Sequence, residues 1–505
     1  MVEAERGLRK AWEGVRRDMG HPALREPVLE DTGSVGTAYI DMAKKRIVVD
    51  PKFITDIRRP GEEDDHVHRI VQMHEVGHYR YHPYDAVTVL REINALMSFE
   101  GGSLDKDAAN GIRLLFDDVV DNSFLILNNK GEEISELYAR MVQGKPPGKA
   151  LSLTLAYYSA ISGLDFGVGK EDLDPGLAGK LDLMQRIDFL DRGSVESNIT
   201  RFARIIKDIN EEQGGGGGAG ESGCGGVSIE SFGKDEVEKA LKRLARELTP
   251  EEFRKLSEAV GASVTDDVSA SVEHYKSIAS QYPLKVLGAP IARADGLYPE
   301  RMTEWQVGDD FRKINPYRSF GIIAPGITKR WVYSPGEAHG EQERVPDSII
   351  ILDSSGSQVN PVTQTSTAVV GAFAVAMAYL RNGATVDVIN FSEKSSVKTY
   401  SRDDLVYREL VRFFGEGTQP PVRQLAGLVR DGSKDVTVIT DGFAGAMSDV
   451  EEFMRLLDEI GMTNRVSFIN IGAIPENVGG YGNVTYHEVS RNEDIGAIII
   501  GDLRW

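Results

Sequence analysis

The spacing of apolar and polar positions in the first half of the chain predicts helices interrupted by two short strands. The stretch Asp64–Tyr81 has the pattern of a helix that ends before Pro83. Only Gly36–Asp41 and Arg46–Asp50 have the pattern of strands. Further helices are expected at Ala4–Met19, Asp85–Met97, Asp105–Leu127, residues 150–212 and residues 232–281. The first part of the chain is therefore expected to be an α+β domain followed by helical regions.

The pattern changes after Asp347, where short apolar runs begin to alternate with helical stretches. Buried β-runs that alternate with helices predict a mostly parallel sheet covered on both faces, an α/β doubly wound (Rossmann-like) fold. Ligands of such sheets bind beyond the carboxyl ends of the strands, where the strand order reverses. The expected strands are Ser348–Leu352, Thr385–Asn390, Asp435–Thr440, Arg465–Ile471 and Val484–Val489, with helices near 363–381, 403–414, 420–430, 447–460 and 491–500.

A glycine-rich run, Gln213–Gly226, separates two helical regions and has the composition of a linker. A phosphate-binding loop is disfavoured there, because no Lys-Ser/Thr follows the glycines and no strand precedes them. At 505 residues the chain is too long for one core. We therefore expect a first domain at 1–145, a helical region at 146–212, a linker at 213–227, a second helical region at 228–285, a connecting segment at 286–344 and the doubly wound domain at 345–505.

Composition narrows the range of partners and compartments. The net charge of −20 argues against nucleic acid or an anionic membrane as the main partner. The single cysteine, Cys224, allows neither a disulfide framework nor a thiolate zinc site, which fits a reducing compartment. The first 17 residues do not form a signal peptide, and the longest apolar run, near Thr367–Leu380, is too short to span a bilayer. A cytoplasmic protein without membrane segments is expected.

The segment His74-Glu75-Val76-Gly77-His78 has the spacing of a catalytic zinc site. Residues four apart share one face of a helix, so His74 and His78 can present ring nitrogens to one Zn²⁺ ion. Glu75, one step round the helix, can reach a metal-bound water and act as the general base. The segment therefore predicts a zinc-dependent hydrolase. Its resemblance to zincin metallopeptidases implies that the strand near Arg46–Asp50 is an edge strand that pairs with an extended peptide substrate, as zincin edge strands do.

A third zinc ligand is expected from a following helix. On a continuous helix His82 would lie about 12 Å from His74, too far to share one ion. The stretch Asp117–Asn122 carries three carboxylates on a mostly apolar helix, which are costly to bury without a cation. It resembles the Asp-x-x-x-Asn helix of a group of prokaryotic zincin-like metallopeptidases that also carry a C-terminal von Willebrand-like domain. That resemblance, over roughly residues 35–130, puts Asp118 in the ligand position; the alternatives are Asp117, Asp121 and, on the intervening helix, Glu92.

A second, oxygen-rich group of residues follows the predicted strands of the C-terminal domain. Asp353-Ser354-Ser355-Gly356-Ser357 ends one strand, Asp441 ends another, and Thr418 lies between them in the sequence. Carboxylates and hydroxyls around one crevice suit a hard cation such as Mg²⁺ or another divalent ion. The residues Asp353, Ser355, Ser357, Thr418 and Asp441 resemble the metal-ion-dependent adhesion site of von Willebrand factor A domains. The resemblance covers residues 345–505 and implies serine and threonine ligands, water-mediated aspartates and a protein partner that completes the coordination shell with a carboxylate.

The segment before this domain points to a second class of function. Gly308-Asp309-Asp310-Phe311-Arg312 and the residues up to Asn315 resemble a segment of prokaryotic CoxE-like von Willebrand A proteins that work beside MoxR-type AAA+ ATPases. Asn315 and Pro316 replace the usual Asp-Trp of that segment. Two functions follow from the sequence. One is a zinc metallopeptidase whose C-terminal domain recruits a protein substrate or regulator, and the other is a non-enzymatic metal-binding adaptor for such an ATPase.

Overall fold

The computed structural model describes a multidomain α+β protein that divides into two compact units, Met1–Thr265 and Asp266–Trp505. The glycine-rich run at 213–226 lies outside the described residues. The described residues are 2–33, 36–99, 104, 106–143, 146–212, 227–262, 266–286, 289–292, 299–306, 309–319, 321, 323–324, 327–333, 341–400, 405–429, 434–443, 447–475, 478–495 and 498–500.

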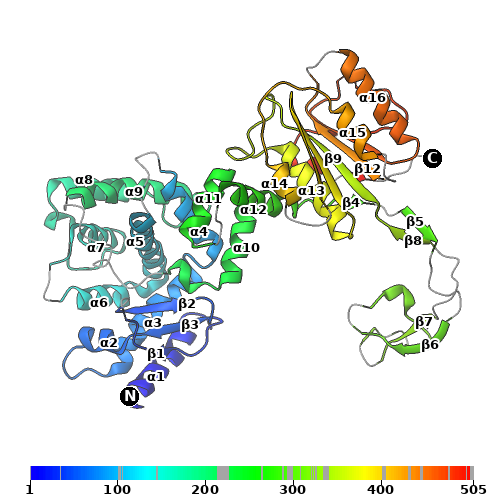
Figure 1. Ribbon diagram of the computed structural model, residues 1–505. Helices are drawn as coiled ribbons and strands as arrows, with labels where there is room; N and C mark the ends of the chain where they lie inside the picture. Colours follow the sequence, from blue (N-terminus) through cyan, green and yellow to red (C-terminus); the bar gives the residue numbers. More distant parts are fainter. Residues whose placement is uncertain are drawn as a thin grey trace. The chain divides into compact units, whose positions relative to one another are not determined.

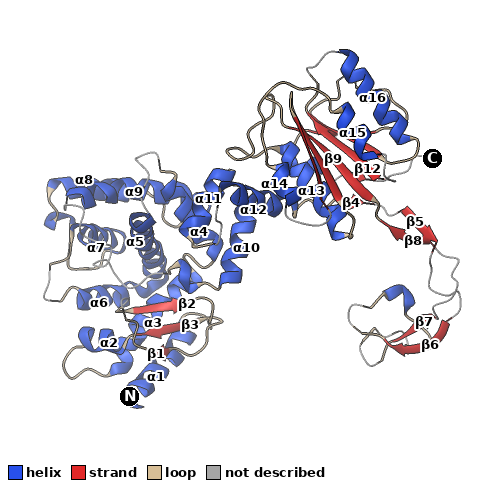
Figure 2. Cartoon of the chain, in the orientation of Figure 1, coloured by secondary structure: helices blue, strands red, loops and turns tan. Residues whose placement is uncertain are grey.

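The N-terminal unit is mostly helical, with one small sheet beside α1 and α3 (Figures 1 and 2). The helix α3 lies at its centre, because it packs against α1, α2, α5, α6 and the sheet and is buried continuously from Ile70 to His78. The helices are α1 (Val2–Asp18), α2 (Pro51–Ile57), α3 (Asp64–Arg80), α4 (Ala86–Met97), α5 (Lys106–Leu125), α6 (Gly131–Met141), α7 (Lys149–Ser162), α8 (Pro175–Met184), α9 (Val195–Glu212), α10 (Lys234–Leu244) and α11 (Pro250–Ala259).

The sheet of this unit contains β1 (Val28–Leu29), β2 (Ala38–Asp41) and β3 (Arg46–Val49), in the order β1-β3-β2. The strand β3 is therefore central. It pairs antiparallel with β2 and parallel with β1, and the amide of Arg25 donates to the carbonyl of Lys45 just before it. The prediction that Arg46–Asp50 forms an edge that can receive a substrate strand is wrong, because neighbours occupy both sides of β3.

The C-terminal unit is built on a six-stranded sheet in the order β11-β10-β9-β12-β13-β14. All neighbouring strands are parallel except β10 and β11, which form an antiparallel hairpin. The strands are β9 (Asp347–Asp353), β10 (Val386–Phe391), β11 (Ser395–Tyr400), β12 (Lys434–Thr440), β13 (Val466–Ile471) and β14 (Thr485–Val489). The five strands expected from the sequence are present. The sixth, β11, is a polar edge strand without the continuous apolar run that marks the buried strands.

Helices cover both faces of this sheet. The helix α13 (Thr367–Arg381) lies on one face, and α15 (Val422–Val429) and α16 (Met447–Gly461) lie on the other (Figure 1). Ile349 and Ile351 of β9 pack in one cluster with Leu425 of α15 and Phe453 of α16. Two shorter helices, α14 (Leu405–Leu410) and α17 (Asn492–Ile495), complete the layers. The chain leaves β9 through α13 toward β10, but leaves β12 through α16 toward β13, so the strand order reverses between β9 and β12. A doubly wound sheet binds ligands at this point.

The residues before the sheet form α12 (Asp267–Ala279) and several short strands. These are β4 (Lys285–Val286), β5 (Ala289–Ala292), β6 (Pro299–Glu304), β7 (Lys329–Tyr333) and β8 (Glu341–Arg344), and β15 (Ile499–Ile500) pairs with β4. β6 and β7 form a hairpin around the Asp309–Asn315 segment. Within it Asp309 pairs with Arg330 at 3.0 Å, and Asp310 accepts a hydrogen bond from the amide of Arg312. None of the described helices is long and apolar enough to cross a bilayer.

Candidate metal centres

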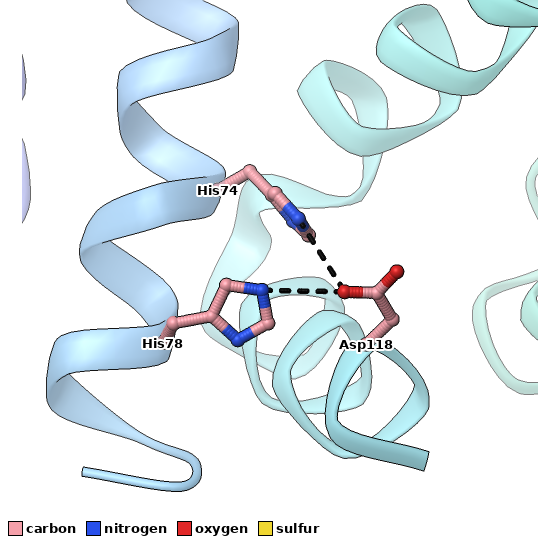
Figure 3. Close-up of side chains that lie close together, drawn as sticks. All are labelled: His74, His78 and Asp118. Atoms are coloured by element: carbon pink, nitrogen blue, oxygen red, sulfur yellow. Dashed lines mark ion pairs between the residues drawn. The ribbon is translucent and has the colours of Figure 1, made fainter. Parts of the chain in front are cut away.

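The central helix α3 places His74 and His78 on one face, where both rings point toward Asp118 on α5 (Figure 3). The Nε2 atom of His78 lies 3.2 Å from Oδ1 of Asp118, and that of His74 lies 3.7 Å from the same oxygen. Ligands on a tetrahedral zinc ion, with bonds of about 2.0–2.1 Å, lie about 3.3–3.4 Å apart. The two distances to Asp118 are close to this value, and the three ligand atoms all lie within 4.8 Å of one another, so the group could hold a metal ion.

The Nδ1 atom of each ring is held by a hydrogen bond, and this leaves each Nε2 atom facing Asp118. Nδ1 of His78 donates to the backbone carbonyl of His82 at 3.0 Å, and Nδ1 of His74 donates to Oδ1 of Asn122 at 3.0 Å. The orientation of the Asn122 amide is fixed because its nitrogen donates to the hydroxyls of Tyr138 and Tyr158, which leaves its oxygen toward His74. Because each Nδ1 carries the proton, each Nε2 keeps its lone pair, as metal-binding histidines require.

Burial sets the protonation of the centre. His74, His78 and Glu75 are fully buried, and Asp118 is 1% exposed. Burial lowers the pKa of both histidines to about 4, so both rings are neutral at pH 7, the form that binds metal. Burial raises the pKa of Asp118 to about 7, and burial together with Asp118 raises the pKa of Glu75 well above its usual range. A divalent cation would offset the cost of keeping these carboxylates charged in the interior.

The alternative zinc ligands occupy other positions. Asp121 lies 3.7 Å from Nδ1 of His74, which is the nitrogen turned away from Asp118. Its carboxylate fills the space beside Gly77, where a Cβ atom would lie 2.7 Å from its Cγ. Glu92 and Asp117 contact His82 instead, at 2.6 and 3.3 Å from its Nε2 atom. Of the four carboxylates considered, Asp118 is the one that faces both Nε2 atoms.

The sequence excludes His82 as a ligand of the same zinc ion as His74, yet the backbone carbonyl of His82 contacts His78. The helix α3 ends at Arg80, so His82 does not continue along the same face. Burial lowers the pKa of the His82 side chain, but the carboxylates of Glu92 and Asp117 outweigh this and raise it to about 9. Arg113, which pairs with Asp117, was also missed. The available signal was that Arg113 and Asp117 lie one helical turn apart within the same apolar helix.

The second predicted centre lies where the strand order of the C-terminal sheet reverses. At the end of β9, Oδ1 of Asp353 accepts from the amide of Ser355 at 2.9 Å, and Oδ2 accepts from the hydroxyl of Thr440 at 2.6 Å. The hydroxyls of Ser355 and Ser357 lie 3.0 Å apart, and Ser357 donates to Asp441 at 3.1 Å. Hydrogen bonds thus connect four of the five predicted residues. This oxygen-only set fits the ligand preference of Mg²⁺.

The fifth residue, Thr418, follows a segment that packs on the same loop. The amide of Gly415 donates to the carbonyl of Ser354 at 3.0 Å, and the amide of Gly356 donates to the carbonyl of Glu416 at 2.6 Å. A Cβ atom at Gly356 would lie only 3.1 Å from the Gly415 carbonyl oxygen, so glycine permits this close approach. The structure therefore holds the segment that leads to Thr418 against the loop that carries Ser355 and Ser357.

Comparison with known proteins adds little to this geometry. No family model and no curated protein matches the chain. Among solved structures, the conserved hypothetical protein BatB from Bacteroides thetaiotaomicron matches 30% of this chain and 94% of its own, at 14% identity and a TM-score of 0.22. The Deinococcus radiodurans RO (RSR) protein matches 82% of this chain and 87% of its own, at 14% identity and a TM-score of 0.23. Scores this low carry no argument about fold or function, so the two centres themselves are the basis for a function.

Proposed function

We propose that the N-terminal unit is a zinc-dependent peptide hydrolase in which His74, His78 and Asp118 hold the metal and Glu75 is the general base. The observation that carries this proposal is the state of Glu75. Its side chain is fully buried beside the centre, and neither carboxylate oxygen has a hydrogen-bond partner among the described residues. An unpartnered buried carboxylate destabilises a fold, so a structural role does not explain it. A role in proton transfer does.

The chemistry follows from the positions of these side chains. A zinc ion held by the three ligands would supply a Lewis acid that activates water and polarises a peptide carbonyl. Glu75 would accept the proton of the attacking water and deliver it to the leaving amine. Burial and the neighbouring Asp118 raise the pKa of Glu75 well above its usual range, so its carboxylate would be a stronger base than an ordinary glutamate. Asn122 and the His82 carbonyl would keep both imidazoles in the ligating tautomer.

The resemblances to zincin-like and von Willebrand A domains are part of the proposal. A helix that carries His74, Glu75 and His78 beside a small sheet agrees with the first. The hydrogen-bonded group of Asp353, Ser355, Ser357 and Asp441 at the strand reversal agrees with the second. In this proposal the C-terminal unit binds Mg²⁺ and recruits a substrate or regulator through a carboxylate of that protein.

The complete burial of the zinc site favours a second candidate function. Glu75 and both histidines have no exposed surface, so a peptide would reach them only after the unit opens. A site that never opens would be a structural zinc site. The chain would then be an adaptor that docks to a MoxR-type AAA+ ATPase through its C-terminal unit. The two functions share the zinc ion and differ in whether Glu75 acts on a substrate.

The first test is the zinc content and proteolytic activity of the full-length chain. We expect one zinc ion per chain at His74, His78 and Asp118, and cleavage of unfolded casein that stops with a chelator and returns with zinc. Asp118→Asn should weaken zinc binding more than 100-fold, beyond the loss typical of residues that only support a ligand. Asp121→Asn is the matched control and should retain zinc. Zinc binding that survives in Asp118→Asn and fails in Asp121→Asn would refute the assignment.

The second test concerns the magnesium site. Asp353→Asn removes one charge while keeping the shape of the side chain, so Mg²⁺ affinity measured by calorimetry should fall about tenfold or more. Glu452→Gln, at an exposed position of α16, removes the same charge away from the site and should leave the affinity unchanged. Equal Mg²⁺ affinity in wild type and Asp353→Asn would exclude Asp353 from the site.

A further inference from the structure

Four charged side chains form a second buried group next to the zinc site. His82 follows α3, Glu92 comes from α4, and Arg113 and Asp117 come from α5; we call them the His82 network. Nε2 of His82 lies 2.6 Å from Glu92 and 3.3 Å from Asp117, and Arg113 pairs with the other oxygen of Asp117. All four side chains are at most 1% exposed. Their burial is not explained by the proposed roles of His74, Glu75, His78 and Asp118.

The distances and charges favour an ion-pair network over a second metal site. His82, Glu92 and Asp117 have the ligand types of a metal site and lie close enough together. However, Nε2 of His82 lies 2.6 Å from Glu92, an ion-pair contact that is shorter than the roughly 3.3 Å between two ligands of one zinc ion. Arg113 already supplies a positive charge to Asp117. Each carboxylate of the group thus has a basic side chain against it, His82 beside Glu92 and Arg113 beside Asp117.

The His82 network touches the zinc site at two points. The backbone carbonyl of His82 accepts the Nδ1 proton of His78 at 3.0 Å. Asp117 directly precedes Asp118 on α5, so the ion pairs of Asp117 restrain the turn that carries this ligand. His82 therefore contacts His78 through its backbone carbonyl and contacts Asp117, the neighbour of Asp118, through its ring.

We propose that the His82 network is a positioning device for the zinc site, which rests on the proposed zinc-binding function. It fixes the rotation of the His78 ring and the position of Asp118 relative to it, and so sets the 3.2 Å separation of their ligand atoms. Outer groups that orient metal ligands typically contribute 10–100-fold to metal affinity. His82, Glu92, Asp117 and Arg113 are positioning residues, because they act through His78 and Asp118.

The test compares zinc binding by full-length variants. His82→Gln removes the ring that contacts Glu92 and Asp117 and releases the loop that carries the His82 carbonyl, so the zinc Kd should rise about 10–100-fold. The visible spectrum of the Co²⁺-substituted protein should also change, because the ligand geometry relaxes. Adding Glu92→Gln should bring both readouts back toward wild type, since two amides can hydrogen-bond in place of the ion pair and the Arg113–Asp117 pair stays balanced. Should His82→Gln not fold, the single Glu92→Gln variant takes its place, with the same direction expected.

A matched control separates positioning from general stability. Glu62 accepts two hydrogen bonds, both 2.6 Å, from the buried Arg140 in the same unit, and Glu62→Gln removes the charge and one of the two acceptor oxygens. It should lower the melting temperature and leave the zinc Kd and cobalt spectrum unchanged. A wild-type zinc Kd and cobalt spectrum in His82→Gln would overturn the positioning role while leaving the zinc site intact. Two zinc ions in wild type and one in His82→Gln would overturn it in favour of a second metal site. A wild-type chain that binds no zinc would refute both proposals.

Discussion

Replacing Glu75 with Gln should leave zinc bound and slow peptide hydrolysis by about 10²–10⁴-fold, the range that one general base contributes. The amide has the shape of the carboxylate but cannot accept a proton from water. Zinc binding should persist, because the proposed ligand atoms are those of His74, His78 and Asp118. The variant should be at least as stable as wild type, since the replaced carboxylate has no described hydrogen-bond partner. The measurements are casein cleavage, zinc content and a denaturation curve on the same preparations.

The Glu75→Gln comparison also separates the two candidate functions. Equal cleavage by wild type and variant would remove Glu75 from the mechanism. Full zinc content in both proteins without any cleavage, alone or with a MoxR-type ATPase, would favour the adaptor function. A residue with a purely structural role gives a different result, because its replacement lowers stability and activity together. The expected result is a loss of activity with stability equal to or above that of wild type, which is the usual consequence of replacing a catalytic group whose burial destabilises the fold.

The sequence predicts the parts of the candidate zinc site that depend on local geometry. His74 and His78 share a face because four residues make about one helical turn. The choice among Asp117, Asp118 and Asp121 depends on how α5 is rotated about its axis, since consecutive residues differ by about 100°. Packing of buried residues such as Phe116 and Val119 sets that rotation. A sequence pattern does not contain this information, and only the resemblance pointed to Asp118.

The contact between His82 and His78 and the strand β11 were both absent from the sequence predictions, for different physical reasons. The distance of about 12 Å to His74 assumed a continuous helix. The chain instead leaves the helix after Arg80, and the backbone oxygen of His82 returns to His78. The strand β11 is polar because it lies at the sheet edge, so it lacks the apolar run that identified β9 and β12. The order of the strands in the sheet could not be predicted from the sequence either. The sequence did place Asp353 and Asp441 at the ends of two strands, as the structure shows.

Gly77→Ala should damage both the fold and the zinc site, although alanine is the better helix former. A Cβ atom at Gly77 would overlap the carboxylate of Asp121, lying 2.7 Å from its Cγ. Asp121 is fully buried, so relief requires α5 to shift away from α3. Such overpacking costs about 1–3 kcal/mol, against a gain of up to about 1 kcal/mol in helix propensity. Because α5 also carries Asp118, we expect weaker zinc binding together with a lower free energy of unfolding, measured by zinc titration and urea denaturation.

Two companion variants make the Gly77 prediction specific to the contact with Asp121. Gly179, in α8 of the same unit, has open space where a Cβ would lie, so Gly179→Ala should stabilise the protein by about 0.5–1 kcal/mol. Combining Gly77→Ala with Asp121→Ala removes the overlapping carboxylate and should restore most of the lost stability, giving a large coupling energy in a double-mutant cycle. Independent, additive effects of the two substitutions would mean that α3 and α5 tolerate the extra methyl group without moving. Gly77 would then matter for another reason than the close approach of the two helices at the zinc site.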